Sequence, residues 1–190
     1  VMSGEVKQDM TLVNKRADAN EKMGHIFTVC GKKTTEVPVI GCGDIGSAVG
    51  RIAAAFGMRV LAYRRHPDPS AGAYIRFVAL DALYAQSDIV SLHCPLTPQT
   101  RGMIDRAAIG RMKDGAVLLN TARGGLLCER DVADALDCGK LYMAGLDVLC
   151  DEPPAPDSPL ARHPRVICTP HISWMPRETR ARLLRAAADN

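Results

Sequence analysis

Short apolar runs alternate with segments of helical spacing along most of this chain. The apolar runs, each of which we expect to form a strand, lie at 37–40, 58–63, 75–80, 88–93, 116–120, 142–148 and 166–168. The spacing of apolar residues between them predicts helices at 45–56, 80–86, 105–112, 129–136 and 176–188. Continuous apolar strands that alternate with helices are typical of a parallel sheet covered on both faces. The pattern therefore predicts an α/β fold, a doubly wound parallel sheet in three α/β/α layers.

The first 36 residues have a different character. They are polar and poorly periodic, and their apolar clusters are confined to Met10–Val13 and Met23–Phe27. Such a segment offers little apolar surface to bury. We expect residues 1–36 to form a polar leader or arm, partly helical or disordered, ahead of a single domain at 37–190.

Composition and charge exclude several classes of function. The 190 residues include 24 basic and 21 acidic side chains, giving a net charge of +3 without a dense basic stripe, so no nucleic-acid partner is expected. No apolar run is long enough for a membrane span, and the first residues do not resemble a signal peptide. The seven cysteines are scattered without a Cys-x-x-Cys pair, which predicts no metal site and reduced thiols in a cytoplasmic protein.

The first strand leads into the glycine motif Gly41-Cys42-Gly43-Asp44-Ile45-Gly46. Gly41 permits a tight turn, Gly43 lets the backbone approach a pyrophosphate, and Gly46 lets the following helix pack closely on the strand. The start of that helix offers free N–H groups and a positive dipole end to phosphates. Because the motif follows the first strand of an alternating pattern, it predicts a dinucleotide-binding domain of Rossmann type.

The end of the second strand bears on the choice of dinucleotide. An NAD site usually has a carboxylate there to bind the ribose 2′-hydroxyl. This chain has Tyr63-Arg64-Arg65 instead, and no carboxylate before Asp68. Two guanidinium groups suit a 2′-phosphate, so Arg64 and Arg65 predict a preference for NADP(H) over NAD(H). The alternative is that both arginines are solvated loop charges.

Three later segments each follow a predicted strand, where ligands bind in open α/β sheets. They are Asn120–Gly125, Gly145–Pro154 and Thr169–Trp174. With these motifs in this order, the chain from about Val37 onward resembles the nucleotide-binding domain of the D-isomer-specific 2-hydroxyacid dehydrogenases. The sequences Leu-Asp-Val, Glu-Pro-Pro and Pro-His-Ile-Ser-Trp within the later two segments resemble the hydroxypyruvate and glyoxylate reductase branch most.

The resemblance implies a catalytic trio. Arg123 would bind the substrate carboxylate and polarise the keto oxygen, for which its planar donors are suited. His171 would give a proton to that oxygen and take it back in the oxidative direction. Glu152 would hold His171 and favour its imidazolium form. Taken singly, each could instead be a surface charge, a solvated carboxylate or a loop histidine.

The resemblance also implies the contacts of the cofactor. Those residues are Gly41, Gly43, Asp44, Ile45 and Gly46 at the pyrophosphate, Cys94, Pro95 and Thr100 at the adenosine, and Thr121, Ala122 and Asp147 at the nicotinamide half, with Trp174 as a further cofactor contact. Asp147 would accept from the carboxamide. Asp44 departs from the family pattern, which often has a basic or neutral residue there. An acidic side chain beside phosphates is unfavourable unless it points away from them. For Cys94 and Pro95, an equal alternative is that they only end the strand and do not contact the cofactor.

The leading hypothesis is an oxidoreductase that transfers a hydride between NAD(P)H and a small 2-keto or D-2-hydroxy acid, hydroxypyruvate or glyoxylate above all. The resemblance implies a homodimer and a second domain that grips the substrate, but residues 1–36 do not resemble that domain. We therefore expect the cofactor half with the catalytic trio and a largely absent substrate domain. The alternative is a non-catalytic dinucleotide-binding interaction module or an inactive truncated remnant.

Overall fold

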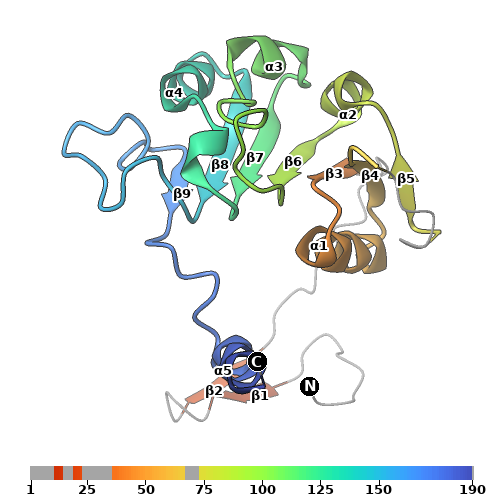
Figure 1. The fold of residues 1–190 in the computed structure, drawn as a ribbon. Helices are drawn as coiled ribbons and strands as arrows, with labels where there is room; N and C mark the ends of the chain where they lie inside the picture. Colours follow the sequence, from red (N-terminus) through yellow and green to blue (C-terminus); the bar gives the residue numbers. More distant parts are fainter. Residues whose placement is uncertain (1–10, 15–18, 23–35, 67–72, 190) are drawn as a thin grey trace. The chain divides into compact units, whose positions relative to one another are not determined.

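The computed structural model describes residues 11–14, 19–22, 36–66 and 73–189 (Figure 1). The chain divides into two units, 1–34 and 35–190. In the first unit, strands β1 (Thr11–Asn14) and β2 (Ala19–Lys22) pair in antiparallel fashion. We expected helix or disorder here. β-branched residues such as Thr11 and Val13 favour extended backbone, and the pairing satisfies its hydrogen bonds. The rest of 1–35 lies outside the described residues.

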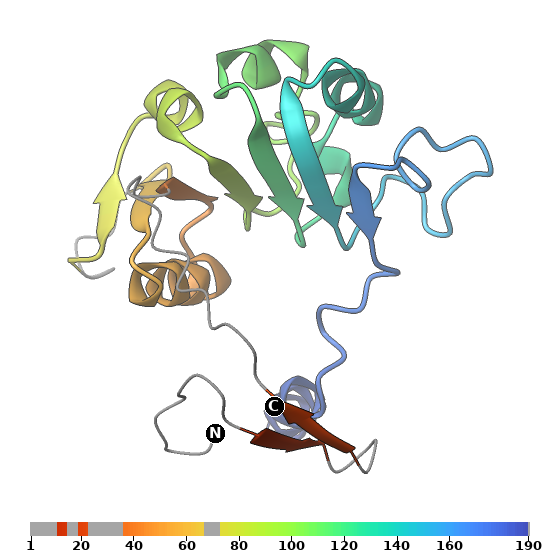
Figure 2. The same ribbon diagram turned by 180° about the vertical axis from the view of Figure 1, so that it is seen from behind.

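The second unit is built on a parallel sheet of seven strands. They are β3 (Glu36–Ile40), β4 (Arg59–Tyr63), β5 (Ile75–Phe77), β6 (Ile89–Leu92), β7 (Ala116–Asn120), β8 (Leu141–Leu146) and β9 (Val166–Cys168). Their spatial order is β5-β4-β3-β6-β7-β8-β9, and every neighbouring pair is parallel (Figure 2). The order reverses direction between β3 and β6, which is the point where open sheets of this kind bind ligands. The predicted doubly wound sheet is confirmed.

Helices cover both faces of this sheet. They are α1 (Asp44–Ala55), α2 (Leu80–Gln86), α3 (Arg106–Arg111) and α4 (Glu129–Asp137). The described part of the chain also contains a short 3-10 turn at Gly124–Leu126 and helix α5 (Arg177–Ala188). Helix α1 lies on one face, and α2, α3 and α4 lie on the other (Figure 1). None of the residues of α5 is buried. No helix in the described part of the chain is both long and apolar enough to cross a bilayer.

Two apolar clusters bind the layers together. The smaller one joins Val39 and Val60 of the sheet to Ala53 of α1. The larger one lies on the opposite face and includes Leu118 of β7 and Leu136 of α4. Burial of apolar area on both faces explains why the strands read as continuous apolar runs. It also holds the carboxyl ends of β3, β6, β7 and β8 at one edge, where the site is built.

Candidate active site

The glycine loop between β3 and α1 has the geometry that its residue types require. Gly41 has a φ of 94°, and a Cβ built on it would lie 2.5 Å from the backbone nitrogen of Cys94. A Cβ on Gly46 would lie 2.2 Å from the carbonyl oxygen of Gly41. A Cβ on Gly43 would meet nothing within 4 Å. Gly41 and Gly46 are thus needed for close packing of the backbone, whereas Gly43 borders open space.

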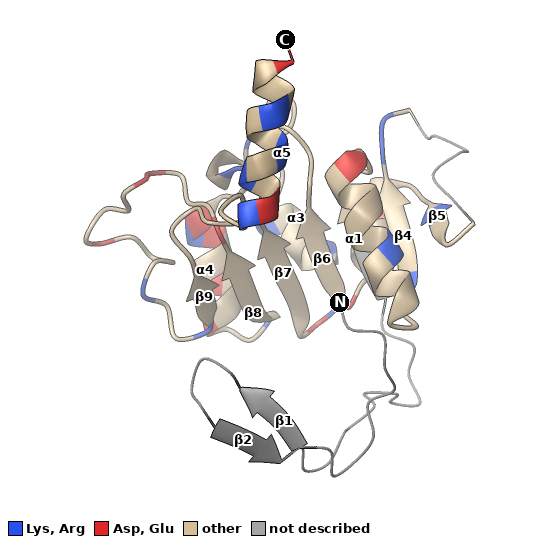
Figure 3. Cartoon of the chain, turned by 90° about the horizontal axis from the view of Figure 1, so that it is seen from below, with Lys and Arg blue, Asp and Glu red and all other residues tan. Residues whose placement is uncertain are grey.

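The start of α1 also explains the acidic residue of the motif. The N-cap residue, Gly43, has no side chain that could cap the helix, and Asp44 lies in the first turn (Figure 3). A carboxylate there interacts favourably with the positive end of the helix dipole. Asp44 and Ile45 are both exposed, Ile45 to 69%. The charge of Asp44 therefore has a role in the helix itself.

The two arginines after β4 are exposed, and one of them contacts the glycine loop. Arg64 donates from Nη1 to the carbonyl oxygen of Cys42 over 3.3 Å. The Cys42 thiol lies 3.3 Å from the hydroxyl of Ser47 in the first part of α1. The basic segment is thereby joined to the turn that precedes α1. Arg65 extends this positive charge at the same end of the sheet.

The loop after β6 is folded by its own hydroxyl groups. Thr100 donates to the carbonyl oxygen of Pro95 over 2.7 Å and accepts from the backbone nitrogen of Thr97 over 2.8 Å. Pro95 is exposed and Cys94 is half-buried. Burial raises the pKa of the Cys94 thiol, so this side chain is neutral near pH 7. The Thr100 hydroxyl thus shapes the loop that presents Pro95.

A buried amide shapes the loop after β7. Asn120 has no exposed surface, and its Oδ1 accepts from the nitrogen of Ala122 over 3.0 Å. Its Nδ2 donates to the carbonyl oxygen of Arg123, also over 3.0 Å. The side chain of Arg123 is exposed, and its Nη1 donates to the carbonyl oxygen of Ala122 over 2.6 Å. Thr121 is exposed beside them. No role was predicted for Asn120, although a polar residue ending an apolar strand was a visible signal.

Gly124, for which no role was predicted either, lies where two of the functional loops touch. A Cβ on Gly124 would lie 2.0 Å from the carbonyl carbon of Leu149 and 2.5 Å from the nitrogen of Cys150. The backbone next to Arg123 therefore passes directly against the backbone that leads to Glu152. Glycine is required here for proximity between two chain segments.

The loops after β8 and β9 bring two of the predicted catalytic residues together. His171 Nδ1 lies 2.8 Å from Oε2 of Glu152. The other oxygen of Glu152, Oε1, accepts from the nitrogen of Leu149 over 3.2 Å. The hydrogen bond from His171 lowers the pKa of Glu152, an effect that burial partly opposes. Glu152 is therefore ionised near pH 7 and fixes the side of the ring that carries Nδ1, leaving Nε2 for another group.

Asp147 and Trp174 also contact the His171 loop. Asp147 is only 4% exposed and lies directly after β8. Burial would raise its pKa, but hydrogen bonds from Ser173, Thr169 and Ile172 outweigh burial and lower it to about 2. Trp174 is 52% exposed, and its Nε1 donates to the carbonyl oxygen of His171 over 2.7 Å.

The fold and this edge of the sheet define a dinucleotide-binding domain that carries an imidazole–carboxylate pair. The family model for the NAD binding domain of D-isomer specific 2-hydroxyacid dehydrogenases matches residues 8–173. The chain belongs to this family, as the sequence motifs predicted. The match begins within the stretch that we expected to be an arm, ahead of the point where we expected the resemblance to start.

Individual relatives agree with this assignment. A hydroxypyruvate reductase from Blautia hydrogenotrophica is 48% identical over 153 residues, covering 80% of this chain and 48% of that protein. A glyoxylate reductase from Korarchaeum cryptofilum is 41% identical over 154 residues, covering 80% and 46%. The NAD-complexed D-isomer specific 2-hydroxyacid dehydrogenase from Lactobacillus delbrueckii ssp. bulgaricus superposes with a TM-score of 0.77 at 33% identity, covering 82% and 51%. The chain thus spans about half the length of these relatives.

Proposed function

We propose that this chain supplies the cofactor half and the catalytic residues of an oxidoreductase acting on a small 2-keto or D-2-hydroxy acid. Hydroxypyruvate and glyoxylate are the proposed substrates, because the relatives at 48% and 41% identity carry the names of those reductases. The observation that carries the proposal is the 2.8 Å contact between His171 and Glu152 at the edge of the sheet that also bears the glycine loop.

The chemistry proposed for these residues follows from their geometry. Glu152 accepts at Nδ1 of His171 and stabilises the imidazolium form, so that Nε2 can give a proton to the carbonyl oxygen of the substrate. In the oxidative direction, the same nitrogen takes the proton back. The exposed guanidinium of Arg123 binds the substrate carboxylate through paired, charge-assisted hydrogen bonds.

The glycine loop fits the dinucleotide that the family model implies. The free space at Gly43 leaves room for a pyrophosphate against the first turn of α1, where Asp44 and Ile45 are exposed. We propose that Cys94, Pro95 and Thr100 border the adenosine, and that a second set borders the nicotinamide half. That second set is Thr121, Ala122, Asp147 and Trp174. When bound, the reduced cofactor supplies the hydride of the reaction.

We propose further that the cofactor is NADP(H) in preference to NAD(H). The support is the pair of exposed guanidinium groups at Arg64 and Arg65, at the position where an NAD site usually has a carboxylate. Arg65→Ala should weaken NADPH binding by about tenfold or more, the loss of a charge-assisted bond, and change NADH binding little. Arg51→Ala, an exposed arginine of α1, is the matched control. Tighter binding of NADH than NADPH by the unaltered chain would contradict the preference.

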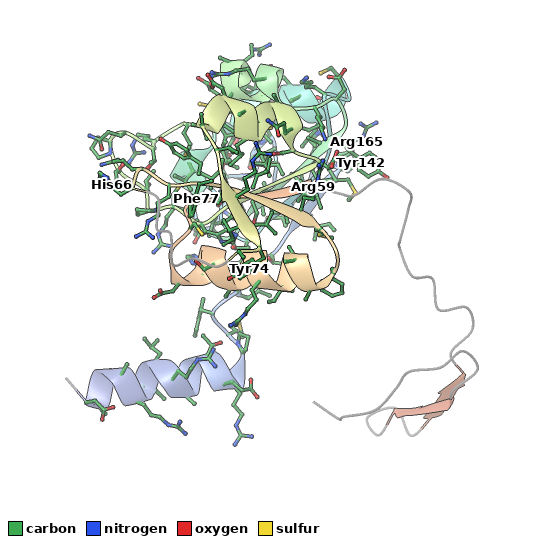
Figure 4. The ribbon with its side chains drawn as sticks, turned by 90° about the vertical axis from the view of Figure 1, so that its right-hand side faces the viewer. Arg59, His66, Tyr74, Phe77, Tyr142 and Arg165 are labelled. Atoms are coloured by element: carbon green, nitrogen blue, oxygen red, sulfur yellow. The ribbon has the colours of Figure 1, made fainter. Side chains whose placement is uncertain are left out.

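The family resemblance implies a homodimer, and an apolar stripe on α1 supports it. Ile52 of α1 and Phe56, its C-cap residue, are spaced four residues apart on one side of the helix and are 56% and 75% exposed. We propose that this stripe packs against a second copy. Ile52→Glu should then convert a sedimenting dimer to a monomer, while Tyr142→Glu, at a side chain that is 61% exposed (Figure 4), should not. A monomer for the unaltered chain would refute it.

The proposed activity is tested by assaying the full chain with hydroxypyruvate, glyoxylate and pyruvate and both reduced cofactors. His171→Ala should abolish turnover while cofactor binding persists. His66→Gln, in the loop after β4 (Figure 4), is the matched control and should keep it. Undiminished turnover in His171→Ala would falsify the role. Cofactor binding without any turnover by the unaltered chain would favour a non-catalytic module. The cytoplasmic location stays a prediction.

A further inference from the structure

Asp147 lies at the centre of the loop that carries His171. Within the described residues, the buried polar side chains are Ser87, Ser91, Asn120 and Asp147. Asp147 follows β8, and its backbone nitrogen donates to the carbonyl oxygen of Asn120 over 2.9 Å. Its position is therefore fixed by the sheet, while its carboxylate faces residues that follow β9.

The carboxylate accepts hydrogen bonds from both sides of His171. Oδ1 accepts from the hydroxyl of Thr169 over 2.6 Å and from the nitrogen of Ile172 over 2.9 Å. Oδ2 accepts from the nitrogen of Ser173 over 2.9 Å. In addition, the carbonyl oxygen of Asp147 accepts from the nitrogen of His171 over 2.9 Å. One residue thus accepts from four donors of the loop, at residues 169, 171, 172 and 173.

The backbone of His171 explains why such a support is needed. His171 has a φ of 52°, the left-handed region that side chains other than glycine rarely adopt. Such a conformation persists only where surrounding contacts hold it in place. The bonds from 169, 172 and 173 to the Asp147 carboxylate hold both flanks of this residue.

We propose that Asp147 is a positioning residue for His171, whose buried carboxylate holds the 169–173 loop so that the imidazole meets Glu152. The role rests on the proposed function only in that His171 is the proton donor. It is a separate role from the expected contact with the nicotinamide carboxamide, because these three hydrogen bonds come from the chain itself and leave the carboxylate at least one further acceptor site. The strongly lowered pKa of Asp147 is consistent with a carboxylate surrounded by donors.

The test is Asp147→Asn in the full chain, followed by amide hydrogen exchange and NMR. An amide of the same shape keeps the Oδ1 bonds but turns an NH₂ group toward the nitrogen of Ser173, donor against donor. Exchange at Ser173, which loses its acceptor, should accelerate about ten- to a hundredfold, and exchange at Ile172, whose acceptor loses its charge, should accelerate by less. The lowered pKa of Glu152 should move back toward its ordinary value, because the hydrogen bond from His171 is weakened.

Two further variants keep the outcome decisive. Thr169→Val removes one donor to Oδ1 and should give a smaller acceleration of amide exchange at Ile172 and Ser173. This variant takes the place of Asp147→Asn if that one does not fold. Asp157→Asn makes the same chemical change at an exposed carboxylate and should leave both readouts unchanged.

Exchange at Ile172 and Ser173 that is unaltered by Asp147→Asn, with NADH binding alone weakened, would overturn the positioning role and favour a cofactor contact. The exchange measurement needs neither cofactor nor turnover. Failure of the unaltered chain to reduce any 2-keto acid would therefore count against the proposed function and leave this result standing.

Discussion

Replacing Gly124 by alanine tests whether two functional loops depend on a single close approach. The added Cβ would lie 2.0 Å from both the carbonyl carbon and oxygen of Leu149 and 2.5 Å from the nitrogen of Cys150. All three are backbone atoms, so no side-chain rotation can relieve the overlap. One of the two segments must move by more than an ångström to restore van der Waals contact.

The cost can be set from the contacts that would be lost. The nitrogen of Leu149 donates to Oε1 of Glu152, and the nitrogen of Cys150 donates to Oε1 of Glu129 over 2.7 Å. Overpacking in a dense interior and the strain on these bonds together should destabilise the fold by about 3 kcal/mol. With a urea dependence typical of a domain this size, the unfolding midpoint should fall by roughly 1 to 2 M.

Gly110→Ala provides the matched control for this substitution. Gly110 lies within α3, and a Cβ there would meet nothing within 4 Å. Alanine should stabilise the helix by roughly 0.5–1 kcal/mol, so the two glycine variants should shift the midpoint in opposite directions. A Gly124→Ala midpoint indistinguishable from the unaltered chain would refute the claim that this contact holds the loops together.

Two more outcomes follow from the buried polar residues. Asn120→Ala should destabilise the fold by about 2 kcal/mol, because the Ala122 nitrogen and the Arg123 carbonyl lose their partner, and urea unfolding would measure it. Turnover should fall more than cofactor affinity, since it is the loop of Arg123 that loosens. The pKa of Asp147 is lowered from 3.8 to about 2, so its contribution to stability is complete above the ordinary value and is lost as the pH falls toward 2. The loss in free energy of unfolding should reach about 2 kcal/mol and be absent in Asp147→Asn. An equal fall in stability with pH in the variant and the unaltered chain would contradict this prediction.

Much of the candidate site could be proposed from the sequence because its motifs are short and each depends on neighbouring residue types. The glycine motif, the arginines after the second strand and the three strand-end segments each require particular residue types at short spacing. Asn120 and Gly124 were missed because their roles depend on distant partners. Gly124 is needed only because Leu149, 25 positions later in the chain, lies against it.

The first residues of the chain show where the pattern carried less information. We expected helix or disorder over 1–36, and the described segments at 11–14 and 19–22 are strands. Strand pairing in so polar a stretch depends on backbone hydrogen bonds between the two segments. Periodicity of side chains does not report such pairing.

The sequence by itself determined the alternation of strands and helices, the parallel sheet and the class of ligand. This is possible because apolar periodicity and glycine placement are local consequences of backbone geometry and burial. The family resemblance implied that Glu152 would hold His171, but only the tertiary structure gave the geometry of that contact and decided that Asp147 supports the 169–173 loop. Those contacts join residues 19 and 25 positions apart, and their geometry follows from the register of β8 and β9, which no local pattern specifies.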